Sequence, residues 1–343
     1  IDNLRHKHGT AVLFITHDMG VVAEIADRIA VLEKGVLVEE GTVDQVLGAP
    51  NHPYTQKLLA AVPSLTPPER APLPDSAPVL TVEGLGKVYR KRSFFGTARE
   101  VRAADDITFS LRRGETLGLV GESGSGKSTV GRCCLRLIEP DAGQIRLSSA
   151  AAGDLVLSDL KPAALRAQRK RIQMVFQDPF ASLNPRQTVG RIISDGPVAH
   201  GTPRSEALAK AANLLELVGL SANAIDRYPH EFSGGQRQRI GIARALALEP
   251  DVLVADEAVS ALDVSVQAQI LTLIKDIQQR LGLAILFVTH DLRVAAQICD
   301  RIAVMQRGRI VEAGPTAALF AVPSHDYTRA LLAAVPGARR FGH

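Results

Sequence analysis

The hydrophobic pattern of the chain alternates between short apolar runs and longer amphipathic stretches. Apolar runs at 115–120, 252–255 and 284–289 have the length of buried strands, and helix-like stretches follow them. A long helix-like stretch separates the first run from the other two, between about residues 186 and 249. The alternation predicts an α/β fold with a mainly parallel central sheet, and the long stretch predicts an inserted helical subdomain.

The pattern near the start of the chain returns near its end. His17 corresponds to His290 and Pro63 to Pro336 at a constant offset of 273 positions, and about half of the aligned residues are identical. Self-similarity over this length indicates an internal repeat at the scale of a domain. The first copy corresponds only to the tail of a unit, and because the chain begins at Ile1 rather than at Met, we expect it to be part of a longer protein.

Within the first copy, residues 11–15 form a short apolar strand pattern. Residues 29–32 and 36–39 predict a hairpin around a Lys-Gly turn. These strands lack the sheet that they should join, and a piece of about 60 residues is marginal even when it is whole. We therefore expect residues 1–62 to be poorly ordered or to dock loosely on a neighbour.

A proline-rich segment separates the two copies. Proline occupies positions 63, 67, 68, 72, 74 and 78, a composition that favours a semi-extended linker. The chain is therefore predicted to contain a fragment of a first unit at 1–62, a linker at 63–78, a complete second unit at 79–314 and a carboxy-terminal extension at 315–343. In the second unit, partly alternating residues at 79–82 and 101–111 predict two further strands.

Composition places the chain among ordinary globular proteins. The net charge is only +4, from 40 basic and 36 acidic residues, which is too balanced to indicate a nucleic-acid partner. No apolar run approaches the roughly 18 residues needed to span a bilayer, so any membrane role is expected to come through a partner. Cys133, Cys134 and Cys299 have no metal-ligand spacing and are expected to be reduced core residues.

Residues 121–128 carry the first chemical motif, because they fit G-x-x-x-x-G-K-[ST] between a predicted strand and a predicted helix over 129–138. In this motif backbone amides form an anion-binding nest, and the following helix points its positive end at the same place. Lys127 can reach the β- and γ-phosphates and Ser128 can bind Mg²⁺. The alternative, a glycine-rich turn without a ligand, does not explain why all these parts are in register. The predicted nucleotide-phosphate site comprises Gly121, Glu122, Ser123, Gly124, Ser125, Gly126, Lys127, Ser128 and Thr129.

Two adjacent carboxylates, Asp256 and Glu257, end the apolar run that begins at Val252. Burying unpaired carboxylates costs several kcal/mol each, so such a pair requires a cation or hydrogen-bond donors nearby. Beside a phosphate loop, Asp256 is predicted to hold Mg²⁺, and Glu257 to orient and deprotonate water. The alternative is a pair of strand-end acids that face solvent.

A second candidate anion site opens the amphipathic helix that precedes these carboxylates. The residues are Ser233, Gly234, Gly235 and Gln236, a possible N-cap followed by two glycines. Taken alone, the segment could be no more than a capped helix. Its position between the phosphate loop and the acidic strand end makes it informative.

With these motifs in this order, the second unit resembles the nucleotide-binding subunit of an ABC transporter. Ser233–Gln236 resembles the signature of that family, and the resemblance covers residues 79–343 and the tail of another copy in 1–62. It implies a P-loop NTPase fold with a mainly parallel central sheet, an antiparallel β subdomain and an inserted helical subdomain. ATP and Mg²⁺ are the implied ligands.

The resemblance also implies roles for single residues. Gln177 matches the Q-loop glutamine, which contacts Mg²⁺ or the attacking water and faces the membrane partner; the implied metal-binding residues are Ser128, Gln177 and Asp256. Asp263 matches the D-loop, and His290 matches the switch histidine that contacts the γ-phosphate. Tyr89 is placed like the aromatic residue that stacks on adenine, although an exposed or partly buried tyrosine is by itself a weak signal. Glu257 is then the catalytic base, with Gln177 and His290 beside it.

The two His-x-Tyr-Thr segments, at His52 and His325, resemble the carboxy-terminal extension of ATPases that serve oligopeptide, dipeptide, nickel and glutathione importers. This resemblance implies ATP hydrolysis coupled to import, with oligopeptides or dipeptides as the first candidates for the solute. Implied partners are a second ABC ATPase unit in a dimer, transmembrane permease subunits and, indirectly, an extracytoplasmic solute-binding protein. The implied location is the cytoplasmic face of the inner membrane.

Two other classes remain as alternatives. A soluble ABC ATPase that acts on nucleic acid or the ribosome should have long heptad arms or a basic linker, and neither is evident here. A P-loop kinase should lack the signature segment and has no reason for a repeated tail. We therefore expect no nucleic-acid partner.

Overall fold

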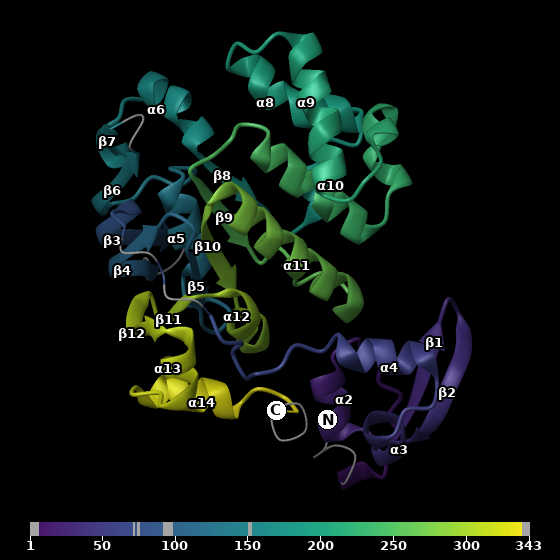
Figure 1. The fold of residues 1–343 in the computed structure, drawn as a ribbon. Helices are drawn as coiled ribbons and strands as arrows, with labels where there is room; N and C mark the ends of the chain where they lie inside the picture. The colour runs from purple at the N-terminus through teal and green to yellow at the C-terminus, as the bar shows by residue number, and fades with distance from the viewer. Residues whose placement is uncertain (1–6, 71–72, 74–75, 92–98, 150–152, 338–343) are drawn as a thin grey trace.

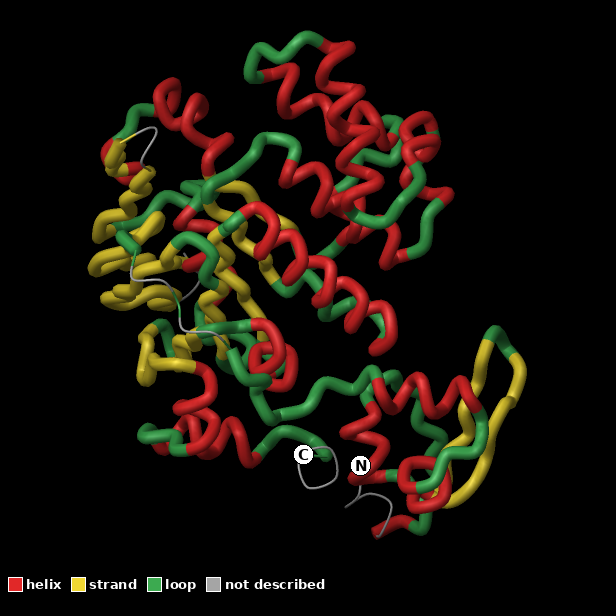
Figure 2. The backbone as a smooth tube through the Cα atoms, viewed as in Figure 1, coloured by secondary structure: helices red, strands yellow, loops and turns green. Residues whose placement is uncertain are grey.

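The computed structural model describes residues 7–70, 73, 76–91, 99–149 and 153–337, which form a large α/β body and a smaller lobe (Figure 1). The second unit makes up the body, and the first copy makes up the lobe. Strands gather in the body between flanking helices, and an all-helical part projects from one end of it (Figure 2).

The central sheet of the body has six strands in the order β12-β11-β5-β10-β9-β8. Five of them are parallel, and β12 runs antiparallel to β11 at one edge. Every residue of β5, β9 and β10 is buried, as expected for parallel strands covered on both faces. The strands are β5 (Thr116–Val120), β8 (Ile172–Val175), β9 (Val252–Asp256), β10 (Ala284–Thr289), β11 (Arg301–Gln306) and β12 (Arg309–Pro315).

A second, antiparallel sheet has the order β4-β3-β6-β7. The strands predicted at 79–82 and 101–111 lie inside two longer ones. The members are β3 (Pro78–Lys91), β4 (Arg99–Arg112), β6 (Ala142–Ser149) and β7 (Gly153–Val156).

Ten α-helices of the second unit and its carboxy-terminal extension have bounds in the described residues. They are α5 (Lys127–Cys134), α6 (Pro162–Gln168), α7 (Pro179–Ser182), α8 (Val189–Ala199), α9 (Arg204–Leu217), α10 (Gly234–Leu246), α11 (Val264–Leu281), α12 (Leu292–Ile298), α13 (Thr316–Ala321) and α14 (Asp326–Ala333). Helices α8, α9 and α10 pack on one another as the predicted helical subdomain. The helix predicted over 129–138 was placed too far along, because it ends at Cys134 and Arg136 has the left-handed φ of 49°.

Alternate residues of the central strands enter two different cores. Val252 and Val254 of β9 belong to the core shared with α5 and the antiparallel sheet, whereas Leu253 and Ala255 belong to the core shared with α10, α11 and α12. This alternation follows from the two-residue period of a strand. The sheet is therefore covered on both faces, and the predicted fold class is confirmed.

The internal repeat is exact in the structure, element by element. The first copy contains α2 (Met19–Ile25), β1 (Arg28–Glu33), β2 (Val36–Thr42), α3 (Val43–Gly48) and α4 (Pro53–Ala60). Each of these begins and ends 273 positions before α12, β11, β12, α13 and α14, respectively. Even the irregularity in the β1–β2 ladder, between Val31 and Leu32, recurs between Val304 and Met305.

The strand predicted at 11–15 was wrong. No strand is assigned there, and Leu13 and Ile15 are each 90% exposed. The equivalent β10 is held by pairing with β5 and β9, and the described part of the first copy contains no equivalent of either. An apolar run without neighbouring strands has no partners for its backbone hydrogen bonds, so it does not form a strand.

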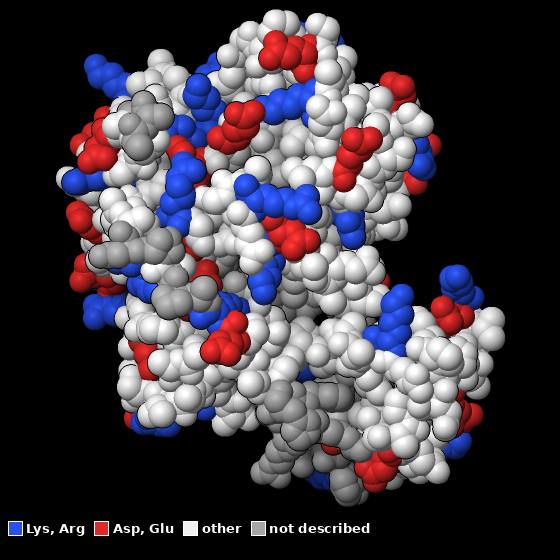
Figure 3. Space-filling model, in the orientation of Figure 1, with Lys and Arg blue, Asp and Glu red and all other residues white. Residues whose placement is uncertain are grey.

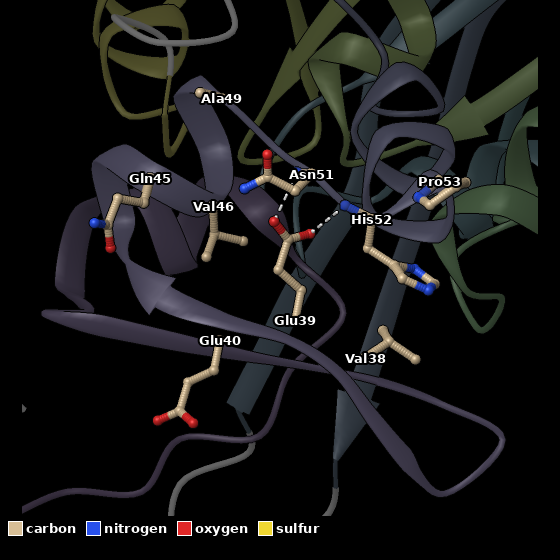
Figure 4. Close-up of a pocket in the computed structure, with 9 residues that line it drawn as sticks. All are labelled: Val38, Glu39, Glu40, Gln45, Val46, Ala49, Asn51, His52 and Pro53. Atoms are coloured by element: carbon tan, nitrogen blue, oxygen red, sulfur yellow. Dashed lines mark hydrogen bonds between the residues drawn. The ribbon is translucent and has the colours of Figure 1, made fainter.

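A glutamate clamp, defined by Glu39 in the first copy and Glu312 in the second, fixes the start of the last helix in each copy. Glu39 accepts hydrogen bonds from the amides of Asn51 and His52 at 2.8 and 3.2 Å, beside a cavity of about 660 Å³ (Figure 4). Glu312 accepts from the amides of Ser324 and His325 at 2.8 and 3.1 Å. Burial alone would raise the pKa of Glu312, but hydrogen bonds from Thr328, Ser324 and His325 outweigh it and lower the pKa to about 2.

The surface carries both signs of charge. On the face shown in Figure 3, acidic and basic side chains are interspersed over the body and the lobe. None of the helices in the described ranges combines the length and the apolar character that crossing a bilayer requires.

The first copy is expected to exchange its amide hydrogens much faster than the body. Among its described residues, the buried hydrophobic residues of its own core are Ile29, Val31 and Val46, whereas β9 and β10 are buried throughout. Local opening follows the buried apolar surface, so protection of β1 and β2 should be lower by at least about 100-fold. Hydrogen–deuterium exchange measures this, and equal protection in the lobe and in β9 would contradict it.

Candidate functional site

The phosphate loop (residues 121–128) lies between β5 and α5, and its glycines are required by its shape. Gly121 and Gly126 have φ of 148° and 108°. A Cβ at Gly126 would lie 1.9 Å from the carbonyl oxygen of Ala103, and one at Gly121 would lie 2.2 Å from that of Met305. The loop therefore packs against the antiparallel sheet and β11 too closely for any side chain at these two positions.

Lys127 begins α5 and turns its ammonium back into this loop. Its Nζ donates to the carbonyl oxygens of Gly121 and Glu122 at 2.7 and 2.9 Å, and it lies 3.4 Å from Ser125 Oγ. Burial lowers the pKa of Lys127, opposed by the charges of Glu257, Asp256 and Glu122. A buried cation inside a loop that also begins a helix is suited to bind a polyphosphate.

Asp256, the last residue of β9, meets the phosphate loop at Ser128. Ser128 Oγ donates to Asp256 Oδ1 at 2.8 Å, and Arg132 Nη2 lies 3.6 Å from the other carboxylate oxygen. Burial raises the pKa of Asp256, opposed by the hydrogen bond from Ser128 and the charge of Arg132. A hydroxyl and a buried carboxylate side by side supply the oxygen ligands that Mg²⁺ prefers, so these residues fit that ion.

Glu257 stands next to this pair and is held by two side chains from other elements. Gln177 Nε2 donates to Glu257 Oε2 at 2.7 Å, and His290 Nδ1 lies 3.2 Å from Glu257 Oε1. The three residues follow β8, β9 and β10, whose carboxyl ends meet at one edge of the parallel sheet. The structure therefore brings together all three residues predicted to be catalytic.

The backbone of Glu257 is in the left-handed region, with φ of 48°. The Glu257 amide donates to the carbonyl oxygen of Val288 at 2.9 Å, and the carbonyl oxygen of Glu257 accepts a hydrogen bond from Ser260 Oγ at 3.0 Å. A non-glycine residue in this conformation persists only where its surroundings hold it there. These two bonds fix the direction in which the carboxylate points.

The signature segment (residues 233–236) lies apart from the phosphate loop of its own unit. Ser233 caps α10 and forms a capping box with Gln236. Helix α10 packs on α8 and α9 within the helical subdomain and also contacts α7 and α11, away from α5 (Figure 1). A Cβ at Gly235 would lie 2.3 Å from Val266 Cγ1, so this glycine is needed for the contact with α11.

Two further predicted residues also lie outside the cluster around Glu257. Asp263 caps α11 and accepts from the amide of Val266 at 3.0 Å and the hydroxyl of Ser265 at 2.9 Å. Tyr89 lies on β3 with 40% of its surface exposed, and Lys87 Nζ lies 5.8 Å from the centroid of its ring. An exposed aromatic ring is free to stack on a flat ligand, but its role remains a prediction.

Comparison with known proteins places this site in a family. Residues 104–260 match the family model described as ABC transporter, and residues 38–98 and 311–340 match the one described as oligopeptide/dipeptide transporter, C-terminal region. Residues 104–260 form an ABC transporter domain. Among curated relatives of this ABC chain are the glutathione import ATP-binding proteins GsiA of Escherichia coli O157:H7 and Salmonella paratyphi A. Each is 50% identical to this chain over an alignment of 360 positions. The alignment covers 97% of this chain and 57% of the relative, so the chain spans little more than half of the relatives' length.

Solved structures of ABC proteins share the fold. One is a dimeric post-hydrolysis state of the ATP-binding cassette MJ0796 bound to ADP and Pi, with a TM-score of 0.60 and 26% identity over 69% of this chain and 98% of that one. Another is cbiO1 of Clostridium perfringens, part of the ABC transporter complex cbiONQ, with a TM-score of 0.58 and 29% identity over 76% of this chain and 97% of that one.

The carboxy-terminal extension contacts the phosphate loop, and no sequence motif predicted this contact. The hydroxyl of Tyr327 accepts a hydrogen bond from the amide of Glu122 at 3.2 Å. Tyr327 belongs to the second His-x-Tyr-Thr segment, in which His325 Nδ1 caps α14 by accepting from the Tyr327 amide at 3.1 Å. The occurrence of this segment in both copies indicates that it has a role, but a sequence pattern does not show which residue the tyrosine contacts.

Replacing Tyr327 with Phe is expected to raise KM for ATP by about three- to tenfold, because a neutral hydrogen bond contributes about 1 kcal/mol. The maximal rate should change little, since the hydroxyl touches the loop rather than Glu257. Steady-state phosphate release at varied ATP measures both constants. Tyr54→Phe, the equivalent change in the first copy, is the matched control, and equal effects of the two changes would contradict the role of Tyr327.

Proposed function

We propose that this chain is the ATP-binding subunit of an importer and that it hydrolyses ATP to drive solute uptake through a partner membrane permease. One observation carries the proposal: Glu257 is held between Gln177 and His290, directly beside the Ser128–Asp256 pair and the phosphate loop. This arrangement places a carboxylate base, an amide and an imidazole next to a polyphosphate site, as hydrolysis of a triphosphate requires.

Each residue has a role that follows from its chemistry. Lys127 and the amides of the phosphate loop bind the β- and γ-phosphates of ATP. Ser128, Asp256 and Gln177 would hold Mg²⁺, which would neutralise phosphate charge when it is bound. Glu257 accepts the proton of the attacking water, while Gln177 orients that water and His290 contacts the γ-phosphate.

The site is completed by a second ABC unit. The signature segment lies away from the phosphate loop of its own unit, and its capped helix N-terminus is suited to an anion. We therefore infer that Ser233–Gln236 of an opposing unit closes over the γ-phosphate, with Asp263 at the contact between units and Tyr89 on the adenine. A dimeric ABC cassette among the solved structures supports this inference.

The relatives support proposals for the solute and the location. Oligopeptides and dipeptides are the first proposed cargo, because residues 311–340 match the extension of such transporters. Glutathione is the next, because relatives with 50% identity are glutathione import proteins. The subunit would act on the cytoplasmic face of the inner membrane, bound to permease subunits that receive the solute from an extracytoplasmic binding protein.

Phosphate release by the purified chain with ATP and Mg²⁺ tests the catalytic part of the proposal. Because each site needs two units, specific activity should be low in dilute protein and should rise with protein concentration. A permease pair in vesicles, together with a binding protein, should then be added. The specific activity should rise further when the binding protein is loaded with one of three solutes, a dipeptide, an oligopeptide or glutathione. A specific activity independent of protein concentration, or transfer of phosphate to an acceptor other than water, would overturn the proposal.

A further inference from the structure

The two copies touch through contacts that obey the same offset of 273 positions as the repeat. The amide of Gly337, beyond α14, donates to Glu24 Oε1 on α2 at 2.8 Å. Gln297, the equivalent of Glu24 on α12, donates through Nε2 to the carbonyl oxygens of Ser64 and Thr66 at 2.8 and 3.0 Å. Ser64 is in turn the equivalent of Gly337. The carboxy-terminal segment of each copy therefore crosses to the helix of the other copy (Figure 1).

Gly20 and Arg293, which are equivalent positions of α2 and α12, face each other between these two crossings. A Cβ at Gly20 would lie 2.4 Å from Arg293 Nη2 and 2.4 Å from the carbonyl oxygen of Pro336. In an interface with two-fold symmetry, a residue that meets its own equivalent lies at the axis. The contacts therefore define a pseudo-two-fold axis between α2 and α12.

Arg293 fills the space at this axis. Its Nη2 donates to the carbonyl oxygen of Pro336 at 2.6 Å and lies 3.8 Å from Asp18 Oδ1 of the first copy. The side chain is 8% exposed, and its Nε is buried without a hydrogen-bond partner in the structure. The site accommodates one guanidinium because Gly20 offers no side chain opposite it. A second cation here would be buried without an added counter-charge, which is unfavourable.

The interface also adjoins the residues proposed for hydrolysis. A cavity of about 130 Å³ is lined by His17 and Asp18 from the first copy and by Ser260 and His290 from the second unit. Asp291, between His290 and α12, caps that helix by accepting from the amides of Arg293 and Val294. The contact surface on α12 is therefore continuous with the position of the switch histidine.

We propose that residues 17–66 of this chain and α12 with the carboxy-terminal segment of the second unit form a pseudo-two-fold interface that persists without nucleotide. The polar contacts just described are made by α2, α12 and the two crossing segments, and none uses the phosphate loop, Glu257 or the signature segment. This interface is separate from the closure of two units around ATP. It tethers the two copies at the ends of their switch helices while the nucleotide site opens and closes.

Chemical cross-linking of paired cysteines in the full chain tests the interface directly. One double variant carries Glu24→Cys with Gly337→Cys, and another carries Ser64→Cys with Gln297→Cys. A short bis-maleimide should join the two cysteines of each variant within one chain. Both should react at the same rate with and without ATP, and at least about tenfold faster than a control pair of Glu24→Cys with Ser205→Cys on α9. The native cysteines at 133, 134 and 299 are buried, so background labelling is low.

Substitution at the axis provides the second arm of the experiment. Gly20→Arg should slow cross-linking of the 24–337 pair by at least about tenfold, because it places a second guanidinium against Arg293. Ala30→Arg adds the same charge at an exposed position of β1 and should leave the rate unchanged. Cross-links that need ATP, that join two chains, or that survive Gly20→Arg would overturn the proposal. The assay requires no ATP turnover, so failure of the proposed hydrolysis is recorded separately.

Discussion

Replacing Glu257 with Gln is expected to lower the rate of ATP hydrolysis by about 10²–10⁴-fold and to leave ATP affinity within a few-fold of the parent, because the change removes the base but no phosphate ligand. The amide is almost isosteric with the carboxylate and can still accept a hydrogen bond from Gln177. It can no longer take a proton from water. Single-turnover phosphate release and equilibrium binding of a fluorescent ATP analogue measure the two effects.

Glu249→Gln is a matched control for this change. Glu249 is also a glutamate with a left-handed backbone, at φ of 51° beside 48° for Glu257, but it pairs with Lys210 on the surface and precedes β9 rather than following it. The Glu249→Gln variant should hydrolyse ATP at the parental rate. If Glu257→Gln turned over at that rate as well, the assignment of the base would be lost.

Replacing Lys127 with Ala is expected to weaken ATP binding by about 10–100-fold, because a charge-assisted hydrogen bond to phosphate contributes about 1.5–3 kcal/mol. Hydrolysis at subsaturating ATP should fall at least in proportion. Isothermal titration calorimetry with ATP and Mg²⁺ measures the affinity. The thermal unfolding midpoint shows whether the chain remains folded, since the carbonyl oxygens of Gly121 and Glu122 lose their donor.

Lys161→Ala removes the same side chain from an exposed position and should leave the affinity unchanged. Lys127→Arg retains the charge in a larger group at a buried position, so this variant should also bind ATP weakly. Wild-type affinity in Lys127→Ala with an intact fold would refute a phosphate site at this loop.

Much of the fold could be predicted from the sequence, because its strongest signals are local. The strands at 116–120, 252–256 and 284–289 are covered on both faces, so they are apolar at nearly every position and stand out. The phosphate loop needs glycines at fixed positions, and the acids at the end of β9 interrupt an apolar run. The family resemblance then supplied Gln177 and His290, which the structure places against Glu257.

The remaining features depend on contacts between residues far apart in the chain, and no local pattern encodes them. Tyr327 meets Glu122 across 205 positions, and Gly337 meets Glu24 across 313. The prediction of a strand at 11–15 failed for the same reason, since an apolar run forms a strand only where neighbours are present to pair with it. The repeat shows that the two copies are alike, but only the structure shows that their ends cross.

The ladder of the first copy has one further consequence, for the behaviour of the protein in concentrated solution. In the second unit β11 is paired on both sides, with β12 and with β5, whereas in the described residues β1 is paired only with β2. Leu32, Val36 and Leu37 of this hairpin are 52–62% exposed. An unpaired strand edge flanked by apolar side chains is a template for strand addition. This edge is therefore where insoluble aggregates would nucleate, and a short apolar β-peptide that caps it would keep the chain in solution.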